Sequence, residues 1–169
     1  AGVSVAFTDL AGNAGTTVTA LTGGNGVRID LTAPKLTTVT MVSNNAGNGT
    51  LANAGDTITV SLTADEAIVA PTVTIAGQSA TVSGSGTSYT AAYTVQASQV
   101  TSLDGKAAGV SVVFADIAGN SGTPVTSLTG GGTVTIDLTP PTLPSVTIAS
   151  DNGADTTRAN AGDTITLTI

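Results

Sequence analysis

Apolar and polar residues alternate along much of the chain, which is the pattern of a strand with one buried face. The clearest run extends from Thr57 to Thr63, where Ile58, Val60 and Leu62 occupy every second position. Valine, isoleucine and threonine dominate such runs, and these β-branched residues lose side-chain freedom in a helix. The pattern therefore predicts a β-rich protein built from short strands.

Seven strands separated by turn-forming residues are expected between positions 31 and 137. They are predicted at 39–43, 57–63, 72–75, 80–83, 88–95, 109–115 and within 125–136, with a break at 129–133. Residues 84–87 are expected to form a loop, and residues 96–108 to include one short helical turn. An all-β fold with this many short strands fits an immunoglobulin-like Greek-key β-sandwich.

A long internal repeat divides the chain. Residues 1–62 align with residues 108–169 at a constant offset of 107, and 38 of these 62 positions are identical. This period is too long for a solenoid rung and matches one small sandwich domain. Proline-containing stretches at 29–34 and 136–141 predict stiff joints.

We therefore expect tandem repeats of 107 residues. Residues 31–137 are predicted to form one complete Ig-like repeat. Residues 1–30 would then be the C-terminal strands of a preceding repeat, and residues 138–169 the N-terminal strands of a following one.

Composition narrows the classes of function. The 169 residues contain no Cys and no His, have a net charge of -7 and include only four basic residues. The absence of Cys excludes disulfides and thiolate zinc sites, and the absence of His removes the commonest general base. The chain also lacks the cluster of basic residues with which a protein binds nucleic acid. Residues 67–103 are uncharged, but Ser, Thr, Gly and Gln interrupt them, so no membrane span is expected. The predicted protein is not an enzyme and binds neither nucleic acid nor a membrane.

Several motifs carry a resemblance that covers the whole chain. They are Phe-Thr-Asp-Leu-Ala-Gly-Asn at 7–13, Phe-Ala-Asp-Ile-Ala-Gly-Asn at 114–120, Thr-Ala-Asp-Glu-Ala-Ile at 63–68 and the two Ile-Asp-Leu-Thr joints. With them the chain resembles the bacterial Ig-like repeats of giant adhesins and other repeat-rich surface proteins. The resemblance implies an extracellular or cell-surface location, a stalk that extends a binding tip, and calcium at domain junctions in many relatives.

Acidic residues at loop positions are the candidate calcium ligands. In an Ig-like strand order, the chain entry and two loops meet at one pole, which would gather Asp30, Asp65, Glu66, Asp116 and Asn120. Calcium takes about six to eight oxygen ligands from carboxylates, amides and carbonyls.

A turn is the alternative to ligation at several of these positions. For Asp116 and Asn120, a turn in which the carboxylate accepts backbone N–H bonds is an equal alternative. Asp30 and Asp137 are likewise open between the two interpretations. Asp56 is expected to be a turn residue.

Three hypotheses of function follow. The first is a structural spacer whose partners are neighbouring repeats of the same chain. The second is a subunit of a self-assembling extracellular filament or sheath, held by homotypic lateral contacts. The third, a carbohydrate- or ice-binding module, requires exposed aromatic residues or a flat threonine array. Tyr89 and Tyr93 are expected to belong to the core instead.

Overall fold

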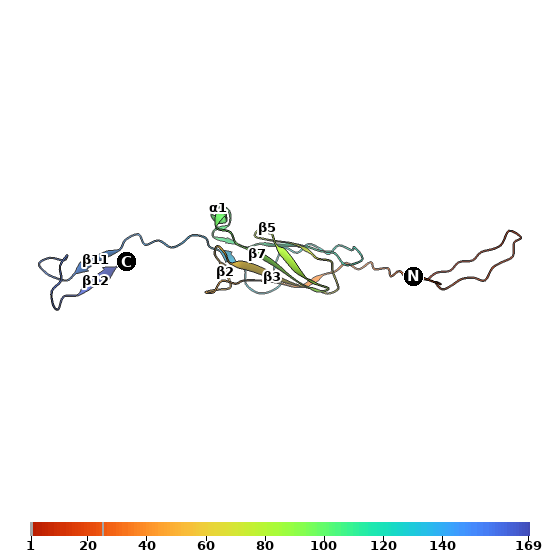
Figure 1. Cartoon of the computed structure of the whole chain (residues 1–169), viewed down its shortest axis with the longest axis horizontal. Helices are drawn as coiled ribbons and strands as arrows, with labels where there is room; N and C mark the ends of the chain where they lie inside the picture. The colour runs from red at the N-terminus through yellow and green to blue at the C-terminus, as the bar shows by residue number, and fades with distance from the viewer. Residues whose placement is uncertain (1, 25) are drawn as a thin grey trace. The chain divides into compact units, whose positions relative to one another are not determined.

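The computed structural model describes residues 2–24 and 26–169. The protein is mostly β, with several antiparallel sheets and one short α-helix. The chain divides into two compact parts, residues 1–137 and residues 138–169. Strands β11 and β12 belong to the second part, and the other strands belong to the first (Figure 1).

The elements are short, as the turn-rich sequence predicts. The strands are β1 (Leu36–Ser43), β2 (Leu51–Ala52), β3 (Thr57–Ala64), β4 (Thr72–Ile75), β5 (Gln78–Ser79), β6 (Thr81–Ser85), β7 (Ser88–Thr94), β8 (Lys106–Ala107), β9 (Val110–Val113), β10 (Thr135–Ile136), β11 (Thr147–Ser150) and β12 (Ile165–Thr168). A 3₁₀ turn, η1 (Ala97–Gln99), leads into the helix α1 (Val100–Leu103). No helix of the described residues is long and apolar enough to cross a membrane.

The largest sheet has the strand order β1-β3-β7-β6, and all its pairs are antiparallel. In β3 the alternation read from the sequence is confirmed, because Ile58, Val60 and Leu62 are all buried. Val60 lies opposite Met41 of β1 and Ala91 of β7, which are buried as well. One face of this sheet is therefore mainly apolar.

Two three-stranded sheets complete the first part. One has the order β5-β4-β9, and the other has β10 between β2 and β8. β10 runs parallel to β2 and antiparallel to β8. Buried side chains of β4 (Val73, Ile75) and β9 (Val110, Val112) join those of the larger sheet, and β4 contacts both β6 and β7. The resulting core consists mainly of Val, Ile, Leu and Ala.

Most of the predicted strands are confirmed, although β1 begins at Leu36 rather than at Val39 and the start of one predicted loop is wrong. The runs 57–63, 72–75 and 88–95 correspond closely to β3, β4 and β7. The loop predicted at 84–87 begins too early, because Gly84 and Ser85 still pair with β7. Gly84 has a φ of +126°, which glycine can adopt because it has no Cβ atom.

The strand predicted within 125–136 is confirmed, but it is short and follows the predicted break at 129–133. Only Thr135 and Ile136 of the stretch 125–136 form a strand, while Val125 contributes a single bridge to Val112. The strands β2 and β8 have two residues each, and alternation cannot be recognised over so short a length.

Residues 2–24 contain a short hairpin with bridges between Val5 and Val18 and between Thr8 and Ala14. Its apolar side chains are exposed, with Phe7 at 54% of its full accessibility. The counterpart of Phe7 at the offset of 107, Phe114, is only 4% exposed. The same motif is thus buried where sheets cover it and open where they do not.

Candidate metal centre

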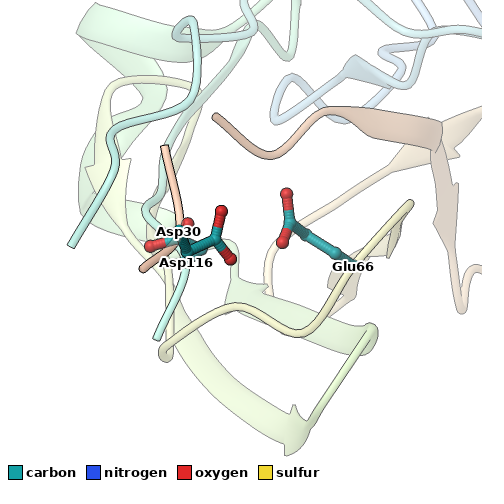
Figure 2. A group of neighbouring side chains, drawn as sticks. All are labelled: Asp30, Glu66 and Asp116. Carbon is teal, nitrogen blue, oxygen red and sulfur yellow. The ribbon is translucent and has the colours of Figure 1, made fainter. Parts of the chain in front are cut away.

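Three carboxylates that are far apart in the sequence meet in the first part of the chain. Asp30 precedes β1, Glu66 follows β3, and Asp116 follows β9. One oxygen of each carboxylate lies within 4.8 Å of the other two. Figure 2 shows Glu66 pointing toward Asp30 and Asp116 from the other side of the group. Within residues 2–24 and 26–169 it is the only group of three or more acidic side chains this close together.

Backbone pairing fixes the positions of the two loops that carry Glu66 and Asp116. Ile68 forms an antiparallel bridge with Asp116, and the Val69 amide donates to the Ala115 carbonyl at 3.0 Å. The buried hydroxyl of Tyr89 donates to the Ile68 carbonyl at 2.8 Å. The backbone segments that carry the two carboxylates are therefore held together by hydrogen bonds.

Asp116 is held in place by Asn120. The Asn120 backbone amide donates to Oδ1 of Asp116 at 2.8 Å, and its side-chain Nδ2 donates to Oδ2 at 2.7 Å. The same Nδ2 donates to the Asp30 carbonyl at 3.2 Å, which joins the chain entry to this loop. Asp116 is only 2% exposed, yet the side-chain bond from Asn120, with the backbone N–H bonds, lowers the pKa of its carboxyl. Asp116 is thus kept ionised.

An identical arrangement occurs in the hairpin of residues 2–24. The Asn13 backbone amide and its Nδ2 each donate to the Asp9 carboxylate at 2.8 Å. These bonds, the side-chain bond first, lower the pKa of Asp9 even though that residue is exposed. Because the loop forms in both places, the turn interpretation of Asp116 and Asn120 is confirmed. Ligation by Asp116 would be an additional role, which depends on Asp30 and Glu66.

Burial and the neighbouring carboxylates make the ionised form of Glu66 less favourable. Partial burial raises the pKa of its carboxyl first, and the charges of Asp30, Asp116 and Asp65 raise that pKa further. A proton or a cation at this position would relieve both effects. The group is therefore electrostatically suited to a positive ion.

Asp65 and Asp56 accept hydrogen bonds that hold the local backbone. Asp65 lies outside the three-carboxylate group, and its Oδ1 accepts the Lys35 amide at 2.8 Å, which fastens the start of β1. Asp56 is a turn residue, as predicted, because its Oδ2 accepts bonds from the Asn53 amide and from the Asn45 side chain. Both Asp65 and Glu66 were predicted as ligands, and Glu66 is the one whose carboxylate belongs to the group.

The pH dependence of stability tests the charge on Glu66. A raised native pKa means that the folded protein binds more protons than the unfolded chain at pH values just above 4.5. Stability contributed by this group is therefore expected to fall as the pH rises through that interval in calcium-free solution. Glu66→Gln removes the titrating group and should abolish this part of the fall. Urea denaturation at a series of pH values measures it, and an unchanged profile in Glu66→Gln would contradict the assignment.

A second surface concerns the third hypothesis. The outward face of the four-stranded sheet carries hydroxyl residues in register, including a row of Thr40, Ser61, Thr90 and Ser83. Ser83 and Thr90 are hydrogen-bonded to each other at 2.9 Å. Tyr89 is buried as predicted, while Tyr93 is only half-buried and donates to the Gln99 side chain. The row consists of two threonines and two serines, and the carbohydrate- or ice-binding hypothesis stays a prediction.

Comparison with protein-family models, with curated proteins and with solved structures gives no match for this chain. The fold and the site therefore define the class: a mostly β protein with an acidic group where the chain enters β1.

Proposed function

We propose that the chain is a structural spacer, a stretch of a tandem array of Ig-like β-sandwich repeats in a large bacterial extracellular adhesin. In this role it presents a distal binding domain away from the cell, its partners are the neighbouring repeats, and it catalyses no reaction. Calcium at the joint before β1 stiffens the array. The observation that carries the proposal is that the same local contacts recur at the offset of 107 residues.

Contacts at both ends of the repeat recur. The bridge between Val5 and Val18 has its counterpart between Val112 and Val125. The hydrogen bond from the Asn45 side chain to Asp56 has its counterpart from Asn152 to Asp163, at 2.7 and 3.0 Å. Equal sequences thus adopt equal local structures in different parts of the chain, which supports a series of like units. Units that contact only their neighbours add length without a new fold.

The location of the acidic group supports a mechanical role for a cation. Asp30 belongs to the proline-containing joint, while Glu66 and Asp116 belong to loops of the body that follows. An ion bound by all three would tie the joint to that body. Three carboxylates offer up to six oxygens, which is the kind of coordination that Ca²⁺ takes.

Calcium is therefore expected to stabilise the protein and to narrow the range of angles at the joint. Extracellular calcium modules bind at roughly 0.1–1 mM, and at ten times the dissociation constant occupancy adds about 1.4 kcal/mol. For a body of this size the melting temperature should rise by about 5 °C. Thermal melting and small-angle scattering, each with calcium and with a chelator, measure the two effects.

A pair of matched variants tests the location of the ion. Asp30→Asn removes a member of the group, whereas Asp137→Asn makes the same change in the identical Ile-Asp-Leu-Thr context outside it. The calcium effect should disappear in the first variant and persist in the second. If melting and dimensions are unaffected by calcium in the unaltered chain, the calcium part of the proposal is wrong.

A further inference from the structure

The loop between β1 and β2 contains an asparagine that is followed, two positions later, by a threonine. Asn48 of Asn48-Gly49-Thr50 is the only asparagine of the 169 residues with Ser or Thr at that spacing. An Asn-x-Ser/Thr triplet without a central proline, in a surface loop of a secreted protein, is the acceptor sequence of N-linked glycosylation. Asn48 and Thr50 are both exposed, so an enzyme can reach the triplet.

The Asn48 side chain is held through its oxygen and not through its nitrogen. Oδ1 accepts the Thr50 backbone amide at 2.9 Å and the Thr50 hydroxyl at 2.8 Å. Among the described residues, no group accepts a hydrogen bond from Nδ2 of Asn48. Asn45 of the same loop differs, because its Nδ2 donates to Asp56 at 2.7 Å. The nitrogen of Asn48 therefore has no partner to give up when it reacts.

The two bonds from Thr50 also bear on the reactivity of that nitrogen. An amide nitrogen is a weak nucleophile, because its lone pair is delocalised toward the carbonyl oxygen. Loss of a proton from Nδ2 makes the nitrogen more nucleophilic and places negative charge largely on Oδ1. Preorganised hydrogen-bond donors stabilise charge that develops at the atom they face. The turn at Asn48 therefore favours the reactive form of the side chain.

The corresponding loop of the second part forms the same turn around a different residue. Asp155 lies 107 positions after Asn48, and its Oδ1 accepts the Thr157 amide at 2.9 Å and the Thr157 hydroxyl at 2.6 Å. The turn thus forms with either side chain, but a carboxylate offers no nitrogen to a sugar. Of these two loops, only the one with Asn48 can be modified in this way.

We propose that Asn48 is an N-glycosylation site, which accepts a sugar from a donor whose anomeric carbon carries a phosphate leaving group. Nδ2 attacks the anomeric carbon, and the bond between that carbon and the phosphate oxygen breaks. The phosphate leaves with the electrons of that bond, and the Nδ2 proton passes to a base of the transferase. The product is an N-glycosidic bond between the sugar and the Asn48 side chain.

The site lies away from the acidic group along β1. Asp30 precedes β1, whereas Asn48 follows its other end. A sugar at Asn48 therefore leaves the three carboxylates uncovered. This inference goes beyond the spacer role and depends neither on calcium nor on neighbouring repeats, so its failure would leave the proposed function unaffected.

Intact-mass spectrometry of the folded 169-residue chain tests the proposal in two reactions. One supplies a soluble N-glycosyltransferase with nucleotide-activated glucose, and the other a membrane oligosaccharyltransferase with a lipid-linked oligosaccharide. We expect the mass of one transferred glycan per chain in at least one reaction, and peptide mapping should locate it at Asn48. The reaction that succeeds identifies the form of the donor. An unchanged mass in both reactions, or a glycan only at other residues, would overturn the inference.

Two substitutions at Thr50 test the part played by its hydroxyl. Thr50→Val keeps a β-branched side chain of similar shape but removes the hydroxyl donor to Oδ1, so the modification should slow by at least about tenfold. Thr50→Ser retains a hydroxyl and should remain a substrate. Asn48→Gln should abolish the gain in mass, and circular dichroism checks that each variant is folded. Equal rates for Thr50→Val and the unaltered chain would refute the proposal.

Discussion

Ile136→Ala is expected to lower the free energy of unfolding of the first part of the chain by about 2–5 kcal/mol. The side chain is fully buried, and its strand β10 lies between β2 and β8. Truncation removes apolar contacts and leaves a cavity that the surrounding strands cannot fill completely. The effect is large because Ile136 belongs to a strand that pairs with both β2 and β8.

The repeat supplies a matched control for this change. Ile29→Ala alters the same residue type at the corresponding position, but Ile29 is 69% exposed. Its effect should stay within about 0.5 kcal/mol. Urea denaturation followed by circular dichroism measures both variants. Equal effects would mean that β10 does not pack as described.

Gly84→Ala is expected to destabilise the fold by about 2–4 kcal/mol. Gly84 has a φ of +126° inside β6, a conformation that a residue with a side chain rarely adopts. A Cβ atom at this position would also lie 2.7 Å from Cα of Tyr89, which belongs to the neighbouring strand. Backbone strain and steric overlap therefore add, and Tyr89 transmits the displacement to the Ile68 carbonyl that it holds.

Gly86→Ala separates the two contributions. Gly86 also has a positive φ, +63°, but an added Cβ there would meet nothing within 4 Å. Only the conformational cost remains, about 1 kcal/mol. Chemical denaturation of both variants should show the larger loss for Gly84→Ala. A loss in Gly86→Ala as large as that in Gly84→Ala would show that the close approach to Tyr89 is not important.

The candidate metal centre illustrates how much of a site can be read before the fold is known. The sequence placed Asp30, Glu66 and Asp116 at one pole, and the structure brings their carboxylates within 4.8 Å of one another. It also proposed Asp65 and Asn120 as ligands. In the structure Asp65 accepts the Lys35 amide and Asn120 donates to Asp116, and ligation by either residue stays a prediction. Adjacent residues such as Asp65 and Glu66 turn in different directions, and the backbone course of the loop decides which one faces the group.

The sequence by itself determined what depends on near neighbours. The β-rich character, the alternation in β3 and the period of 107 residues are visible in it. The loop that Asp9 shares with Asn13 recurs between Asp116 and Asn120, because its hydrogen bonds span at most four residues. Such structures form wherever their residues occur, whatever surrounds them.

Only the tertiary structure decided which copy of a repeated segment is buried and what covers it. Ile136 and Ile29 both begin an Ile-Asp-Leu-Thr segment, but only Ile136 is enclosed, since β2 and β8 pair with its strand. The meeting of Glu66 with Asp116 likewise follows from the bridge between their two loops. Burial and strand pairing are properties of residues distant in the sequence, and a local pattern of apolar positions carries no information about those partners.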